Sequence, residues 1–253
     1  MSTPTTTSTD TPNFAGMIAG RPGWVSLFEE QLKEDPSAKS YPFSTYSTAD
    51  NAPKVRYVVH RSLTPLSNLL LTSTDHRMKK YQELEENPNV ELAFWMEKTG
   101  VQFRISGKAA VLPNKPEEKS ALEKIVKETL HAKGEEATPE YWVNKRSEEF
   151  EKMSGHLRAT FARPPPGTPL EDLKEGEKPG DWSESIKPPG EDEKTKSDLA
   201  RANDNYHLVA ISPSSVEMLE LKAIPNRRTV WHRQTGGDGN GGDGEWSVLS
   251  VAP

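Results

Sequence analysis

The chain has 253 residues, of which 33% are hydrophobic and 28% charged, and its formal net charge at pH 7 is −6. This composition favours one modest core with loose attachments, and the mild charge gives no reason to expect nucleic acid or a membrane as a partner. The sequence has no cysteine, so disulfides and thiol chemistry are excluded. It also shows no apolar run near the ~18 residues of a membrane helix and no leader pattern, so we expect a cytoplasmic or possibly nuclear location.

The N-terminal part predicts a tail followed by a helix. Residues 1–22 are rich in Ser, Thr and Pro, which predicts disorder. From there on, apolar residues recur at spacings of three and four and share one helical face: Trp24, Leu27, Phe28 and Leu32. A loop is expected through Pro36 and Pro42.

The next part predicts two pairs of strands with a helix between them. Runs rich in β-branched and aromatic residues place the strands at 54–61, 67–74, 90–96 and 101–112. Asp75 can cap the helix over 76–87, which Asn87 and Pro88 end.

Two polar amphipathic segments follow, at about 115–132 and 139–153, and they predict helices on the outside of the fold. Residues 163–205 are dense in proline, glycine and charge, so they hold few apolar groups to offset the entropy of ordering them. Such a segment is either a functional lid or a disordered insertion, and its composition favours disorder.

Strand character returns near the C-terminus, in four runs: 206–211, 215–221, 229–234 and 246–251. The glycine run 236–244 lacks a following helix, a Lys-Ser/Thr pair and a second copy, so it predicts a hairpin rather than a phosphate loop or a calcium repeat. Short consecutive strands without crossover helices predict one mainly β (α+β) domain over 23–253, an antiparallel barrel with peripheral helices, and exclude a Rossmann fold.

Basic residues gather around the second predicted strand. Arg56 lies on the first strand, Thr74 ends the second, and Lys79 and Lys80 open the helix. Guanidinium groups, ammonium groups and a helix N-terminus favour phosphate, although solvated basic side chains are the plainer reading. The histidines show no metal-ligand spacing and no nucleophile motif is present, so no metal site is predicted and no catalytic side chain is named.

Five motifs in order carry a family resemblance. Residues 56–61, Arg-Tyr-Val-Val-His-Arg, resemble the Arg-x-Val-x-x-Lys/Arg strand of the pyridoxamine 5′-phosphate oxidase-like FMN-binding split-barrel family. The other segments similar to that family are 74–80, 85–88, 102–107, and 225–228 with the closing strand 246–253.

The resemblance implies FMN bound at the interface of a homodimer. It implies these cofactor contacts: Arg56, Lys79 and Lys80 at the phosphate, Tyr57, Val58 and Val59 along the isoalloxazine, Thr74 at the phosphate or ribityl chain, Gln102 at the flavin, and Arg228 from the second subunit. Substrate contacts are expected from Arg61, Arg158 and Arg227. The Tyr-x-x-x-Arg-x-x-x-Ser and Arg-x-His sets of the vitamin-forming members do not appear in place, which is typical of a divergent branch.

We therefore expect an oxidase-type FMN-dependent oxidoreductase, resembling pyridoxamine/pyridoxine 5′-phosphate oxidase, that acts on a small anionic substrate. Two alternatives stay open. One is an FMN-binding protein without turnover of the vitamin phosphate, or a flavin reductase-like protein. The other is an interaction scaffold whose working parts are the tail and the 163–205 insertion.

Overall fold

The computed structural model describes residues 17–18, 20–114, 118–190, 192–234 and 245–253. The strands are β1 (Met17–Ile18), β2 (Arg21–Pro22), β3 (Ser40–Ser47), β4 (Ala52–Val59), β5 (Ser62–Leu63), β6 (Leu70–Asp75), β7 (Asn89–Met96), β8 (Val101–Val111), β9 (Tyr206–Glu220), β10 (Arg227–Arg233) and β11 (Trp246–Val251). The helices are α1 (Gly23–Glu34), α2 (Lys79–Glu86), α3 (Lys119–Glu128), α4 (Pro139–Glu151), α5 (Gly155–Thr160) and α6 (Glu193–Asn205).

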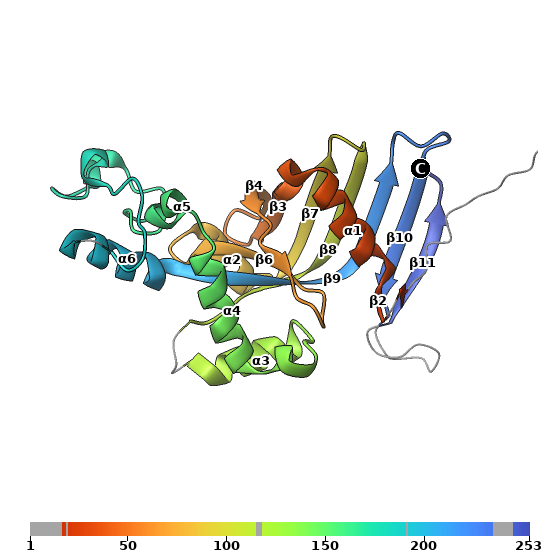
Figure 1. The fold of residues 1–253 in the computed structure, drawn as a ribbon, viewed down its shortest axis with the longest axis horizontal. Helices are drawn as coiled ribbons and strands as arrows, with labels where there is room; N and C mark the ends of the chain where they lie inside the picture. Colours follow the sequence, from red (N-terminus) through yellow and green to blue (C-terminus); the bar gives the residue numbers. More distant parts are fainter. Residues whose placement is uncertain (1–16, 19, 115–117, 191, 235–244) are drawn as a thin grey trace, which may run out of the picture.

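One antiparallel sheet dominates the fold, with the strand order β11-β10-β9-β8-β7-β3-β4 (Figure 1). The long strand β9 also pairs with β6, which joins the short strand β5. β4 lies against β6, where the Thr72 hydroxyl donates to the Val59 carbonyl oxygen at 2.9 Å, but the described residues form no ladder between them. The predicted fold class, a mainly β antiparallel split barrel with peripheral helices, is confirmed.

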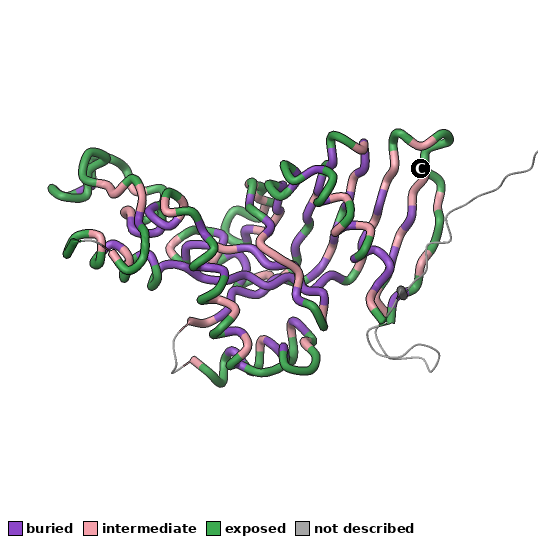
Figure 2. The backbone as a smooth tube through the Cα atoms, viewed as in Figure 1, coloured by how far each residue is buried: buried purple, intermediate pink, exposed green. Residues whose placement is uncertain are grey.

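Helix α1 closes the barrel's main core. Trp24 and Phe28 are fully buried and Leu32 nearly so, as the predicted helical face requires. The Phe28 ring meets the rings of Phe94 and Phe103 edge-on, at centroid distances of 4.8 and 5.3 Å. Buried positions alternate with less buried ones along β3, β7 and most of β8, the period expected of strands with one face on a core, whereas the first half of β9 is buried throughout (Figure 2).

The register of β8 against β9 shifts between Ser106 and Gly107. A Cβ atom at Gly107 would lie 2.3 Å from the Ser212 carbonyl oxygen, so only glycine lets the two backbones approach this closely. The shift lies where the other edge of β9 changes partner, from β10 along Ser215–Glu220 to β6 along Tyr206–Ile211.

Three boundaries differ from the sequence prediction. Residues 40–47, predicted as loop because of Pro42, form β3, whose alternating side chains are buried beside β4. The runs 206–211 and 215–221 are one strand, because Pro213 sits at the register shift rather than at a turn. The helix predicted over 76–87 begins at Lys79. The predicted hairpin at 236–244 and most of the predicted tail lie outside the described residues.

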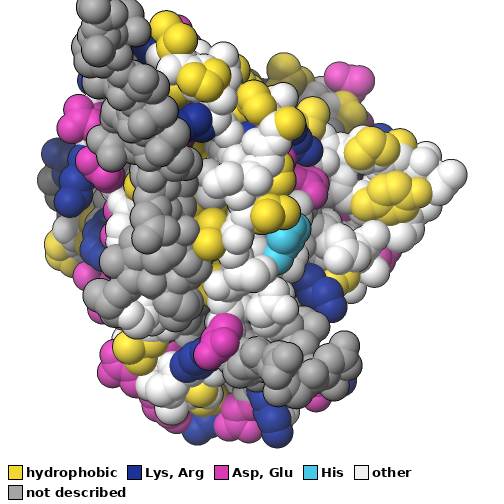
Figure 3. Space-filling model, turned by 90° about the vertical axis from the view of Figure 1, so that its right-hand side faces the viewer, with side chains coloured by type: hydrophobic (Ala, Val, Ile, Leu, Met, Phe, Trp, Pro, Cys, Tyr) yellow, Lys and Arg dark blue, Asp and Glu magenta, His cyan; other side chains and the backbone are white. Residues whose placement is uncertain are grey.

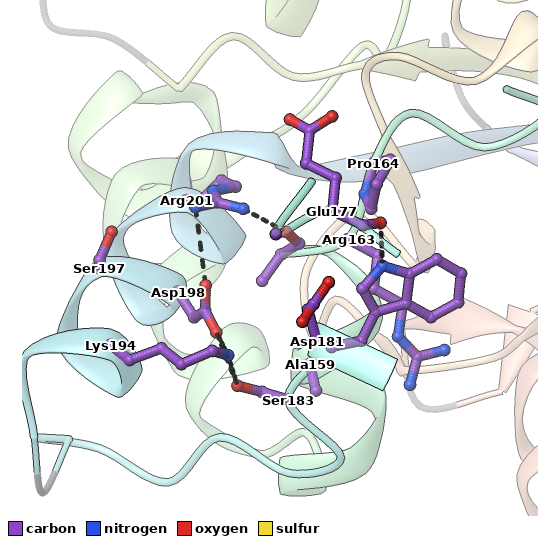
Figure 4. Close-up of a pocket in the computed structure, with 13 residues that line it drawn as sticks. Ala159, Arg163, Pro164, Glu177, Asp181, Ser183, Lys194, Ser197, Asp198 and Arg201 are labelled. Carbon is purple, nitrogen blue, oxygen red and sulfur yellow. Dashed lines mark hydrogen bonds and ion pairs between the residues drawn. The ribbon is translucent and has the colours of Figure 1, made fainter. Parts of the chain in front are cut away.

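The described part of segment 163–205 contains α6 and two single-turn 3-10 helices, at Leu170–Asp172 and Pro179–Asp181. Two of its few apolar residues, Ile186 and Ala202, are fully buried in a cluster with Phe150 and Tyr206, whereas Leu170 is exposed. With α5, the segment also encloses a polar hollow of about 160 Å³, where Asp198 accepts hydrogen bonds from Ser183 and Lys194 (Figure 4). Composition predicts disorder here, whereas the structure gives packed helices.

Candidate functional site

The opening of the barrel between β4 and β6 is a cleft of about 250 Å³. Strand residues form its floor, the start of α2 forms one end, and α5 with the chain after it forms a wall. The lining residues are Tyr57, Val58, Val59, Arg61, Ser73, Thr74, Asp75, Met78, Lys80, Leu157, Thr160, Phe161 and Pro166. The cleft therefore contains predicted residues from both the 56–61 and 74–80 motifs, together with a wall that the motifs did not indicate.

Strand β4 supplies the apolar floor. It ends the main path of the sheet, and within the described residues β3 is its only strand partner. Val58 faces inward and is buried, whereas Tyr57 keeps 73% of its surface exposed and Val59 40%. An edge strand that exposes large apolar side chains beside a cleft offers a flat surface for a ring or for another chain.

Lys80 provides the positive charge at the cleft's end. Its side chain is buried, and its ammonium group donates to the Ser73 carbonyl oxygen at 3.4 Å. Burial, aided by the nearby Arg56, lowers the pKa of Lys80 to about 8, although Asp75 and Glu83 partly oppose this. One long hydrogen bond offsets little of the cost of burying an ammonium group. An anion placed beside it would favour its charged form.

Asp75 and Arg77 neutralise each other next to this end. The Asp75 carboxylate accepts from the Arg77 backbone N–H at 2.9 Å and from its guanidinium Nε and Nη2 atoms at 2.9 and 2.6 Å. Asp75 therefore stabilises the turn before α2 and does not cap the helix, whose N-cap residue is Met78. Thr74 is buried, and its hydroxyl donates to the Asp75 carbonyl oxygen at 3.0 Å.

Arg56 points to the inner side of β4, between the barrel and α2. Its Nη2 atom lies 2.7 Å from a carboxylate oxygen of Glu83, and its Nη1 atom donates to the Thr45 hydroxyl. Glu83 was not predicted as a site residue. Its position three residues after Lys80, on the same face of α2, is the signal that could have found it.

Gln102 lies in a second hollow, of about 400 Å³, with Trp95 and Tyr57 among its lining residues. Tyr57 lines both hollows, so its exposed ring lies between the Lys80 end and the Gln102 end. Leu157, Thr160 and Phe161 belong to the wall of the first hollow only. The second hollow lies mainly over β3 and β7, and Tyr57 is the β4 residue that it shares with the first.

Comparison with known proteins agrees with this geometry. Residues 21–113 match the family model "Pyridoxamine 5′-phosphate oxidase, FMN-binding domain". That range spans α1 through β8 and contains β4, β6 and Lys80. Over this range the chain is similar to the FMN-binding domain of the pyridoxamine 5′-phosphate oxidase family.

A curated relative in this family is the pyridoxine/pyridoxamine 5′-phosphate oxidase of Psychrobacter cryohalolentis. It is 36% identical over 87 residues, which are 34% of this chain and 38% of the relative. The match thus spans well under half of the relative's length.

Two solved structures share the fold over nearly their whole length. A pyridoxamine 5′-phosphate oxidase-related, FMN-binding protein from Nostoc punctiforme has a TM-score of 0.66 at 22% identity, covering 91% of this chain and 97% of that one. PhzG from Burkholderia lata, solved with tetrahydrophenazine-1-carboxylic acid, has a TM-score of 0.52 at 15% identity, covering 90% and 92%.

The residues present fit the family's cofactor, FMN. The Lys80 end supplies an under-compensated cation for a phosphate, and the Tyr57 and Val59 side chains supply an apolar surface for a flavin ring. Arg61 lines the same cleft, and its buried Nε atom has no hydrogen-bond partner among the described residues. A donor left without a partner beside an open cleft is the kind of group that a bound ligand satisfies.

The remaining predicted residues lie elsewhere. Lys79 is exposed on α2 and does not line the cleft. Arg227 pairs with Glu220 at 2.6 Å, and Arg228 lies 3.9 Å from Glu217, both on the β9–β10 hairpin and away from the cleft of their own chain. A contribution of Arg228 across a dimer stays a prediction.

Arg158 differs from its prediction as a substrate contact. It is buried, and its guanidinium donates to four backbone carbonyl oxygens: those of Ile186, Phe150, Glu151 and Met153, at 2.7 to 3.1 Å. These bonds tie α4, α5 and the 163–205 segment together. The side chain is committed to backbone groups and does not line the cleft, which sequence spacing could not reveal.

Proposed function

We propose that this chain is an FMN-dependent oxidoreductase acting on a small anionic substrate, with the β4–β6 cleft holding the cofactor. The observation that carries the proposal is the buried, weakly compensated Lys80 ammonium at one end of a cleft whose floor is the exposed face of β4. When bound, FMN would supply two-electron redox chemistry of the hydride-transfer type.

The chain's own residues bind and position. Lys80 would hold the phosphate at the cleft's end, with Arg56, which pairs with Glu83 and is not among the cleft-lining residues, next to it on β4. Tyr57 and Val59 would support the ring, and Leu157 and Phe161 would exclude water from one side of the cleft. Arg61 lies two residues after β4 and lines the cleft, so it would attract an anionic substrate. Its guanidinium makes one described hydrogen bond, to the Ser73 hydroxyl at 3.2 Å.

A homodimer with FMN at its interface is part of this proposal. The cleft of one chain, about 250 Å³, is smaller than the ~300–1,000 Å³ typical of ligand sites. Its open side adjoins exposed apolar side chains, Val55 at 71% exposure, Tyr57 at 73% and Trp95 at 44%. A second subunit that covers this strip would enclose the ligand and make the two sites equivalent.

The distribution of charged side chains on the surface bears on the class of partner. On the described part of the surface in Figure 3, acidic and basic side chains are interspersed, which supports a small-molecule partner over a nucleic acid. In the described residues no helix is long and apolar enough to cross a membrane.

The test begins with the purified protein's visible absorption spectrum and its titration with FMN. Lys80→Met should weaken FMN binding at least about tenfold, because it removes a charge-assisted contact, while Lys79→Met, one residue away and exposed, should leave it unchanged. A protein that neither contains nor binds FMN contradicts the proposal. If FMN binds but no amine, alcohol or NAD(P)H donor reduces it, the alternative of a binding protein without turnover is correct.

Pyridoxamine 5′-phosphate is the informative substrate. The vitamin-forming substrate sets are missing from this sequence, so we expect slow or absent peroxide release with it despite normal FMN binding. Turnover comparable to that of an authentic oxidase would show that other residues replace those sets.

A further inference from the structure

A buried carboxylate already occupies the guanidinium that is expected at the cofactor phosphate. Glu83 lies on α2, and only 8% of its side chain is exposed. One of its oxygens, Oε2, is 2.7 Å from Arg56 Nη2 and also accepts the Thr45 hydroxyl, which in turn accepts from Arg56 Nη1. Three elements, β3, β4 and α2, thus close a ring of hydrogen bonds around one side of Arg56.

The same carboxylate also acts on Lys80, since its charge opposes the lowering of the Lys80 pKa. The local charge is therefore two cations against one fixed anion, because Asp75 and Arg77 form their own pair at 2.6 Å. A phosphate that approaches Arg56 and Lys80 gains their attraction and meets the repulsion of Glu83.

Glu83 cannot easily leave. It is held on a helix whose next residue, Leu84, is packed in the core, and a buried carboxylate separated from its cation is costly. Arg56 must then be shared between Glu83 and any bound phosphate.

We infer that Glu83 is a specificity-determining residue, an internal anion that competes with the cofactor phosphate for Arg56 and so reduces the site's preference for a phosphorylated flavin over an unphosphorylated one. This inference rests on the proposed FMN site. It concerns how much more tightly that site binds FMN than riboflavin, which the similarity to the family leaves open.

The test is Glu83→Gln, which keeps the side chain's shape and its ability to accept from Thr45 and Arg56 but removes the charge. The control is Glu85→Gln, which makes the same change in net charge at an exposed position of α2. Dissociation constants for FMN and riboflavin are measured by titration of the flavin-free protein, with circular dichroism to confirm folding. Glu83→Gln should tighten FMN about tenfold, or ~1.4 kcal/mol, and leave riboflavin and the control unchanged.

Other results overturn the inference. If the FMN affinity of Glu83→Gln is unchanged, Glu83 does not compete with the phosphate. If the affinity for FMN falls while that for riboflavin does not, Glu83 instead orients Arg56 for the phosphate. Loss of both flavins means a structural role. Glu83→Asp, one methylene shorter, is the second variant if Glu83→Gln does not fold, and it should give a smaller gain for FMN alone.

A separate arm uses inorganic phosphate and thermal melting. Phosphate should raise the melting temperature of Glu83→Gln more than that of the wild type. If no variant binds flavin but this difference appears, the proposed function fails while the competition at Arg56 stands. If flavin binds but the difference is absent in both assays, the competition fails alone.

Discussion

The buried position of Lys80 makes FMN binding depend on pH in a way that can be worked out from its pKa. In the flavin-free protein that pKa is lowered to about 8, and a bound phosphate dianion would return it towards the ordinary value of about 10.4. Binding therefore takes up a proton above pH 8. About nine-tenths of Lys80 is charged at pH 7 but only about one-tenth at pH 9, so the FMN affinity should fall about tenfold between these pH values.

The assay is a titration of the flavin-free protein at intervals from pH 7 to pH 9. Riboflavin is the matched ligand, because it shares the ring but lacks the phosphate, and its affinity should stay nearly constant. Lys80→Arg, whose guanidinium does not titrate in this range, should bind FMN with a flat profile. An FMN affinity that is constant in the wild type, or a dependence that persists in Lys80→Arg, would refute the assignment of Lys80 to the phosphate.

Three further predictions concern stability. Burial lowers the pKa of His60 to about 4, so stability is lost as pH falls from about 6.5 to about 4, and melting curves should show a steeper loss in the wild type than in His60→Gln. Gly107→Ala forces a Cβ against the Ser212 carbonyl oxygen and should cost at least ~1–3 kcal/mol in denaturant unfolding; Gly180→Ala, which meets nothing within 4 Å, is the control, and equal stability of the two would contradict the close approach. Limited proteolysis separates the two views of 163–205, since packed helices predict resistance until the protein unfolds and disorder predicts rapid cleavage.

The sequence predicted the part of the site that depends on local pattern. Runs of β-branched residues predict β4 and β6. The position of Lys80, at the start of a helix that follows a strand, predicts its place in the site. Pro42 predicts a loop at 40–47, although Tyr41, Phe43 and Thr45 alternate as the inward side chains of a strand do. β3 can contain this proline because it pairs with β7 at only two positions, neither of them Pro42.

What could not be predicted depends on contacts between distant segments. The spacing of Glu83 from Lys80 could have placed it on the site face of α2, but nothing in the sequence indicates that it pairs with Arg56. Likewise, nothing near Arg158 indicates that four carbonyl oxygens will surround it. The same holds for the cleft wall, where Leu157 and Phe161 meet strand residues about a hundred positions earlier. Periodicity finds elements, but the pairing of charges across elements is decided by the packed fold.

The pairing of β6 with β9 has a consequence for how the chain is made. Leu70 is opposite Ile211, and Asp75 is opposite Tyr206, so β6, which otherwise pairs only with the two-residue strand β5, gains its long strand partner only after more than half of this sequence's length has followed it. A ribosome-bound chain that already displays residues 56–80 still lacks the strand that positions them, and such distant pairing is slow to form. FMN can then bind only after β9 has been synthesised. Chains cut short before β9 would expose one edge of an apolar β6 that pairs with β5 alone, and they should be degraded or aggregate rather than accumulate as partial flavoproteins.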